Sequence, residues 1–194
     1  MDSSANAPFV VSPDQTASEL HDPQQSDFLT DDVRDYDWWV IHAKSRCEKK
    51  IADECGRRNI RCYLPLYKKY TRNSQRTVCF DVPLFSGYLF MYSDAGGRMD
   101  ILRTNYTANI FVVEDTQTFL DQIRTVHSAL AGRMHVEPFD EFQEGTMVRV
   151  RRGPLAGVQG PIIQKKTTYK LILKVDFIQK NVAVEVDIGD VEQI

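Results

Sequence analysis

The sequence predicts an α+β protein: an N-terminal α/β sandwich, in which helices pack on an antiparallel sheet, followed by a small β-barrel. Two observations lead to this prediction. Residues 36–137 alternate between strand and amphipathic-helix patterns in the order β-α-β-β-β-α-β-α, which favours a sheet covered by helices. Residues 144–194 carry five short strand patterns, which are typical of a small closed barrel.

Charge separates the first 35 residues from the rest of the 194-residue chain. Residues 1–35 contain eight acidic side chains and one basic side chain, and they are rich in Asp, Ser, Gln and Pro. Such a segment buries too little apolar area to offset the entropy lost on ordering, so we expect a disordered acidic leader. Residues 36–194 contain 23 basic and 19 acidic side chains, so the folded part is mildly basic.

Several classes of protein are disfavoured by what the sequence lacks. No apolar run approaches the length of a membrane span, and the N-terminus lacks the basic and apolar regions of a signal peptide. The cysteines at 47, 55, 62 and 79 have no C-x-x-C spacing, and the four histidines have no metal-ligand spacing. We therefore expect reduced thiols in the cytoplasm, with no membrane association, no metal and no cofactor.

The first predicted strand is followed by a basic amphipathic helix. Residues 38–42 are mostly apolar, so we expect a central strand that is covered on both faces. Ser45 with Glu48 three residues later predicts a capping box, and the helix then continues to Arg58. Its buried stripe is a four-residue repeat of Cys47, Ile51 and Cys55.

Basic residues are concentrated between Lys44 and Arg76. This stretch contains 11 basic and three acidic side chains, and its second half predicts a hairpin of residues 68–72 and 76–82 around residues 73–75. The positive excess suits binding to a phosphate backbone. A charged face that is merely solvated is the alternative interpretation.

Residues 83–92 predict a bend and then an apolar strand. Pro83 and Gly87 shape the bend. Alternation in the strand places Tyr88, Phe90 and Tyr92 on one face and Leu89 and Met91 on the other. Because both faces are apolar, one packs in the core and the other is covered by a helix of the same domain or by a partner.

A helix and a linker are predicted to close the N-terminal unit. The helical repeat of Phe119, Ile123, Val126 and Leu130 begins after a cap at Asp115 or Thr116 and ends at Gly132. Pro138 and the acidic and amide residues that follow it indicate a linker over residues 138–143.

The stretch from Val148 to Gly160 predicts a strand, a turn and a second strand. Apolar Val148 and Val150 alternate with Arg149 and Arg151. Glycines at 153, 157 and 160, with Pro154 beside the first, predict that the chain folds back. On these grounds alone, an ordinary barrel hairpin explains the pattern.

The same stretch resembles a KOW motif, with Arg149, Gly153, Gly157 and Gly160 as its matching residues. An aromatic opening strand, a basic helix, P-L-F-x-G-Y at residues 83–88 and a terminal helix precede it. In this order they resemble the NusG family over residues 36–194, and most closely its specialised paralogues. The resemblance implies a NusG N-terminal-like domain at 36–137 and an SH3-like KOW barrel at 144–194.

The resemblance implies a transcription elongation factor that binds RNA polymerase and suppresses pausing and termination. The specialised paralogues are antiterminators of long operons, including those for surface polysaccharides. The P-L-F-x-G-Y match places Phe85 and Tyr88 in an apolar patch that docks on polymerase helices. Tyr63, Leu64 and Pro65 are its expected neighbours by strand order. This hypothesis requires that the aromatic residues line an open groove.

The resemblance also implies two further partners. A basic surface at the start of the first helix would contact non-template DNA, and its residues here are His42, Lys44, Arg46 and Lys50. The KOW domain would bind a ribosomal protein or a termination factor.

Two other functions are weighed against this one. The first is an RNA-binding or ribosome-associated protein that uses the KOW barrel. The second is an enzyme, which the absence of P-loop, G-x-S-x-G and H-E-x-x-H motifs disfavours. We therefore expect no catalytic residues.

Overall fold

The computed structural model describes residues 36–72, 76–139, 145–165 and 168–194. The predicted acidic leader (1–35), the hairpin turn (73–75) and residues 140–143 of the predicted linker lie outside the described residues. The first elements are β1 (Asp37–Ala43), α2 (Glu48–Arg57), β2 (Arg61–Tyr63), β3 (Leu66–Arg72), β4 (Thr77–Pro83), β5 (Tyr88–Ser93), α3 (Ala95–Arg103), β6 (Thr107–Val112) and α4 (Thr116–Ala131). The remaining elements are β7 (Val136–Phe139), β8 (Thr146–Val150), β9 (Gln159–Lys165), β10 (Thr168–Val175), η1 (Asp176–Ile178), β11 (Lys180–Val186), η2 (Ile188–Asp190) and β12 (Val191–Gln193).

The N-terminal sheet is antiparallel and has the strand order β2-β5-β1-β6. On one face Ile41, Leu89 and Met91 pack against α2 and α3. On the other face Trp38, Phe90 and their neighbours pack against the apolar stripe of α4. The alternation predicted for β5 is confirmed, and helices cover both faces of the sheet.

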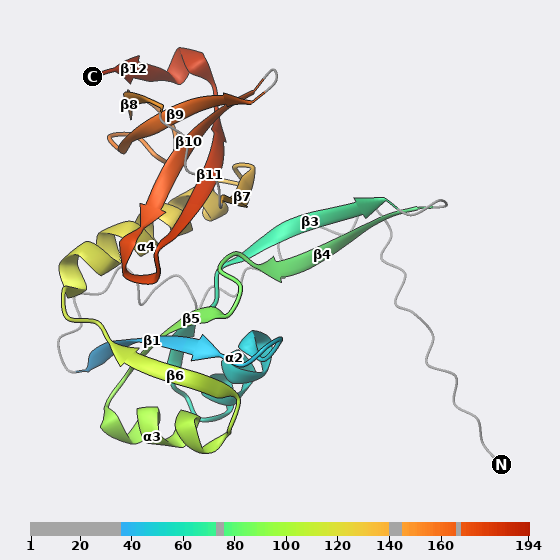
Figure 1. The fold of residues 1–194 in the computed structure, drawn as a ribbon, viewed down its shortest axis with the longest axis vertical. Coiled ribbons are helices and arrows are strands. Elements are labelled where there is room, and N and C mark those ends of the chain that lie inside the picture. The colour runs from blue at the N-terminus through green and yellow to red at the C-terminus, as the bar shows by residue number, and fades with distance from the viewer. Residues whose placement is uncertain (1–35, 73–75, 140–144, 166–167) are drawn as a thin grey trace.

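The hairpin of β3 and β4 is a separate two-stranded ribbon. Its register runs from Leu66 opposite Pro83 to Arg72 opposite Thr77, and in Figure 1 it projects away from both sheets. Pro65 lies between β2 and β3, and its carbonyl accepts a hydrogen bond from the N–H of Leu84 at 2.8 Å. That bond fixes the base of the ribbon.

The C-terminal sheet has six strands in the order β12-β8-β9-β10-β11-β7. All five strands predicted in this part of the chain are present. Among the described residues no pairing joins the edge strands β12 and β7, so closure into an SH3-like barrel stays a prediction.

The predicted linker begins too early. Residues 138 and 139 lie in β7, which pairs with β11 from Phe139 opposite Asn181 to Val136 opposite Val184. Glu137 of the same strand forms a salt bridge with the largely buried Lys170 of β10. The segment directly after α4 is therefore an edge strand of the C-terminal sheet.

The predicted capping box is wrong. Helix α2 begins three residues after Ser45 because Arg46 has a φ of 58°, a left-handed conformation that cannot belong to a right-handed helix. The carboxylate of Glu48 instead accepts a hydrogen bond from the N–H of Gly87 at 2.8 Å, although 39 residues separate the two. Glu48 therefore holds the bend before β5 against α2.

Helix α4 lies between the two sheets (Figure 1). Its cap is Asp115, whose carboxylate accepts the N–H of Thr118, and its C-cap is Gly132, both as predicted. A single apolar cluster contains Phe90 of the N-terminal sheet, Phe119 of α4 and Leu171 of β10. The two parts of the chain therefore share one core around α4.

Removing the Glu48 carboxylate is expected to destabilise the protein. Glu48→Ala leaves the Gly87 N–H without its acceptor, and we expect a loss of about 1–3 kcal/mol in the free energy of unfolding. Urea denaturation followed by circular dichroism measures it. Asp53→Ala, an exposed acidic position on the same helix, is the control. Equal losses in the two variants would contradict the proposed role of Glu48.

Candidate functional site

The residues predicted to form an apolar patch are largely covered in this structure. Phe85, Tyr63 and Leu64 are 2%, 3% and 5% exposed. Pro65 is also buried, and Tyr88 is half-buried. The expected open groove is therefore not present in this arrangement of the chain.

Phe85 belongs to an aromatic cluster that both parts of the chain build. We define the cluster as Phe85, Phe90, Phe119 and Phe177. Phe85 lies edge-on to Phe90 with ring centroids 6.1 Å apart, and Phe90 is 5.6 Å from Phe119 and 5.7 Å from Phe177. Phe119 and Phe177 are themselves 4.8 Å apart. Such contacts contribute about 0.5–1.5 kcal/mol beyond area burial.

Phe177 is the C-terminal member of this cluster. It lies in η1, between β10 and β11, and it is half-buried. Figure 1 shows the end of the β10–β11 hairpin beside α4. The cluster is therefore covered from two sides, by α4 of the N-terminal unit and by η1 of the C-terminal unit.

Polar contacts hold the same two elements together. The side-chain amide of Gln122 on α4 donates to Oδ2 of Asp176 at 2.8 Å, and its Oε1 accepts the backbone N–H of Asp176 at 3.0 Å. Two reciprocal bonds fix the position of Asp176 and hence of Phe177, the next residue. Because the pair is exposed, each bond contributes only about 0.5–1.5 kcal/mol.

The other residues that were predicted for the patch lie on opposite faces of the chain. The Tyr63 hydroxyl lies 3.3 Å from Nδ1 of His127 on α4, and burial raises the pKa of the Tyr63 phenol. Leu64 packs in the opposite cluster, with Ile51 and Cys55 of α2. Neighbouring residues of an extended chain face opposite sides, so Tyr63 and Leu64 do not share a surface.

The predicted basic residues do come together, at the end of β1 and the start of α2. Lys44, Arg46 and Lys50 are exposed and His42 is half-buried. We call these four residues the basic surface. Its cations lie just after the end of β1. The backbone N–H of Lys44, the first residue after that strand, donates to the carbonyl oxygen of Tyr106 at 2.8 Å.

Residues after α3 complete this surface, and the sequence did not indicate them. Nζ of Lys44 donates to Oδ1 of Asn105 at 2.6 Å, and Nζ of Lys50 lies 5.5 Å from the centre of the Tyr106 ring. Asn105 has a φ of 59°. Asparagine often adopts this left-handed conformation just after a helix, and that preference is the sequence signal of a turn here. These contacts hold two of the cations in place.

Tyr88 links the basic surface to the aromatic cluster. Its ring stacks on the imidazole of His42, with centroids 4.9 Å apart and planes 14° apart. It also packs at the edge of the shared core. Among the patch residues, Tyr88 is therefore the one that lies beside the basic surface.

The KOW-like residues build a turn. Gly153 and Gly157 both have a φ of 88°, which favours glycine, and the N–H of Gly157 bonds to the carbonyl of Val150 at 2.8 Å. A Cβ at Gly160 would lie 2.8 Å from the carbonyl oxygen of Ile172. Nη1 of Arg149 lies 3.7 Å from Oε1 of Glu192. The glycines therefore serve backbone geometry.

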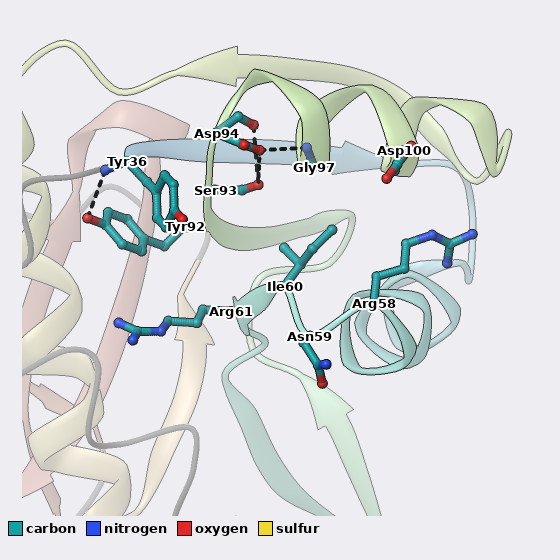
Figure 2. A pocket seen from close by; sticks show the side chains of 10 residues that line it. All are labelled: Tyr36, Arg58, Asn59, Ile60, Arg61, Tyr92, Ser93, Asp94, Gly97 and Asp100. Carbon is teal, nitrogen blue, oxygen red and sulfur yellow. Dashed lines mark hydrogen bonds between the residues drawn. The ribbon is translucent and has the colours of Figure 1, made fainter.

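A shallow pocket lies at the far edge of the N-terminal sheet (Figure 2), with a volume of about 270 Å³. Its lining residues come from β2, β5, α3, the loop between α2 and β2, and Tyr36 just before β1. Oδ1 of Asp94 accepts the N–H of Gly97 at 2.8 Å, and the Tyr92 hydroxyl accepts the N–H of Tyr36 at 3.1 Å. The described residues contain no cluster suited to a metal ion.

Comparison with known proteins gives a family match over half the chain. A family model described as transcription termination factor nusG matches residues 36–139. No curated protein matches the sequence. Within the described ranges, every helix is too short or too polar to cross a lipid bilayer.

Two solved structures are similar in fold. NusG of Thermotoga maritima, from a study of its domain interaction, is 18% identical with a TM-score of 0.50, covering 82% of this chain and 97% of that one. An MjSpt4:Spt5 complex is 13% identical with a TM-score of 0.28, covering 81% of this chain and 96% of that one. The first supports the fold, and the second is too dissimilar to add to it.

Phe177→Ser is expected to loosen the contact between η1 and α4, because it removes a ring from the aromatic cluster. We expect faster amide hydrogen exchange in α4, by roughly tenfold for each 1.4 kcal/mol lost, with exchange in β1 and β5 less affected. Ile188→Ser, at an exposed residue of η2, is the control. Unchanged protection of α4 would show that Phe177 does not hold the two units together.

Proposed function

The chain belongs to the NusG family, and we propose that it is an elongation regulator that binds RNA polymerase through its N-terminal unit and suppresses pausing and termination. It acts by binding, without catalytic activity of its own, in the compartment that holds the polymerase. Like the specialised paralogues it resembles, it would serve as an antiterminator, with long polysaccharide operons as candidate targets. The observation that carries the proposal is the family match over residues 36–139, which includes Phe85 and Tyr88.

The buried cluster sets a condition on this proposal. A polymerase helix cannot reach the aromatic cluster while η1 and α4 cover it, so binding through the cluster requires that η1, with the C-terminal unit, and α4 both move away from it. The apparent affinity then equals the intrinsic affinity scaled by the fraction of molecules in the open arrangement. Tyr88, half-buried beside the cluster, is accessible in both arrangements and would make the first contact.

The basic surface would bind non-template DNA next to the polymerase contact. Its three cations are exposed, and Tyr88 stacks on His42 at the border with the aromatic cluster. Phosphate binding would be sensitive to salt, because each neutralised phosphate releases condensed counterions. A protein bound to both the polymerase and the DNA would oppose the rearrangements that accompany pausing.

The C-terminal unit would bind a ribosomal protein or a termination factor once it is displaced. In the proposed open state its sheet closes as a KOW barrel. The alternative, an RNA-binding KOW protein, is less well supported because the arginines of this stretch have internal contacts. Arg149 and Arg152 lie 3.7 and 3.4 Å from acidic side chains, and Arg151 donates to the carbonyl of Gly189 at 2.8 Å.

Retention on immobilised core RNA polymerase tests the main proposal. Tyr88→Ala should weaken binding at least severalfold, because it removes the accessible contact, and Phe177→Ser should tighten it by favouring the open arrangement. Phe111→Ala, at an exposed residue of β6, is the control. Run-through of a defined terminator should change in the same order. Retention by ribosomal RNA, with none by polymerase, would instead favour the alternative.

The salt dependence of DNA binding tests the basic surface. Lys44→Ala with Lys50→Ala removes two cations, so we expect the slope of log K against log salt to decrease by about 1.8 for duplex DNA or about 1.4 for a single strand. Lys174→Ala with Arg133→Ala, at two exposed positions elsewhere, is the matched control. An unaltered slope would mean that the basic surface is only solvated.

A further inference from the structure

The β3–β4 ribbon carries a second arrangement of aromatic and cationic residues, separate from the basic surface. We propose that this ribbon binds a single-stranded nucleic acid. On one face of the ribbon bases would stack on Phe80 and phosphates would pair with Lys69 and Arg76, and on the other face Tyr70 and Arg72 would serve the same roles. This goes beyond the proposed function, which places DNA on the basic surface at the start of α2.

Both aromatic rings of the ribbon are open to solvent. Tyr70 is 67% exposed and Phe80 is 52% exposed. The outer half of β3 is exposed on both of its faces, and neither ring belongs to the apolar clusters of the fold. Because the rings do not support the core, they are available for stacking with a ligand.

The register places a ring and a cation together on each face. Lys69 is directly opposite Phe80, and Tyr70 is opposite Cys79. Residues two apart share a face of a strand, so Tyr70 and Arg72 lie on the face opposite to that of Lys69 and Phe80. A strand of nucleic acid on either face would meet one stacking ring and at least one cation.

The ribbon has an excess of positive charge. Nζ of Lys68 lies 2.7 Å from Oδ1 of Asp81, and this hydrogen bond, with the nearby carboxylate, raises the pKa of Lys68. Lys69, Arg72 and Arg76 form no ion pair within the part of the chain that the structure describes. Three uncompensated cations favour a polyanion over an apolar protein partner.

Exposed rings favour a single strand over a duplex. Stacking on aromatic side chains requires a free base face, and duplex bases are already stacked on one another. Each such contact contributes about 1–3 kcal/mol and tolerates any base. A seven-residue strand such as β3 spans roughly 23 Å, a length that can follow several nucleotides.

The base of the ribbon is attached beside the basic surface. Nζ of Lys49, on α2, donates to the backbone carbonyl of Asp81 on β4 at 2.8 Å. Lys50 of the basic surface is the next residue of that helix. A strand that leaves the basic surface could therefore continue along the ribbon, and the two sites would act on the same nucleic acid.

Fluorescence anisotropy with the full chain tests this proposal. The probes are a labelled 20-nucleotide oligo-dT and a duplex of equal length, without polymerase. Tyr70→Ser with Phe80→Ser should weaken oligo-dT binding at least tenfold and duplex binding less than threefold. Phe111→Ser with Val112→Ser removes similarly exposed apolar side chains from β6 and should leave both affinities unchanged.

A charge variant separates stacking from phosphate contacts. Lys69→Gln with Arg72→Gln removes one cation from each face, so it should lower the salt slope for oligo-dT by about 0.7, the value for one phosphate, while the aromatic variant keeps the wild-type slope. Unchanged melting temperatures show that the variants fold. The Lys44→Ala, Lys50→Ala protein is measured in parallel, so a failure at the basic surface is distinguishable from a failure at the ribbon.

Three results would overturn the proposal. In the first, the aromatic variant binds oligo-dT within twofold of the wild type. In the second, it loses affinity equally for both probes, which would indicate duplex binding. In the third, it binds both probes normally but no longer binds core polymerase, which would make the ribbon a protein-binding element.

Discussion

The structure depends on the need to cover both faces of the strand pair β1 and β5. Tyr88, Phe90 and Tyr92 alternate with Leu89 and Met91, so neither face of β5 can be left to water. Helices α2 and α3 cover the face that carries Leu89 and Met91. Helix α4 together with residues of the C-terminal sheet covers the aromatic face. One apolar cluster, around α4, is therefore shared by two parts of the chain that the sequence suggests are separate.

This shared cover connects the fold with the proposed function. The apolar face best suited to a partner helix is also the one that the C-terminal unit occupies. Near η1, the contacts between the two parts are a half-buried ring and two exposed hydrogen bonds. At the other end of α4 the packing is close, since a Cβ at Gly132 would lie 2.4 Å from Cγ of Pro154. In the proposed function, a partner that binds only the open arrangement would shift the population of molecules toward it.

The exposed cations are concentrated in particular regions of the surface. Exposed cations lie at the start of α2 and along the ribbon, whereas Arg149 and Arg152, which flank the C-terminal turn, lie beside acidic side chains. Lys49 joins the first two regions through the carbonyl of Asp81. The N-terminal unit thus presents one extended cationic side next to its covered aromatic face, which suits a protein that contacts polymerase and nucleic acid together.

The sequence by itself determined the features that depend on neighbours in the chain. Alternation in β5, the Asp115 cap and Gly132 end of α4, the ribbon around residues 73–75, and the strands of the C-terminal sheet all follow from short-range periods and turn residues. The resemblance to the NusG family, and not local periodicity, indicated His42, Lys44, Arg46 and Lys50 as one surface, and the structure places them at a single strand end.

Only the tertiary structure decided which distant residues meet. Glu48 bonds to Gly87 instead of capping its own helix, and β7 pairs with β11 instead of serving as a linker. Phe177 covers an aromatic face that begins almost 90 residues earlier in the chain. Periodicity shows that a face is apolar and must be buried, but it carries no information about what buries it. That choice depends on the combined free energy of long-range contacts, which no local window of sequence contains.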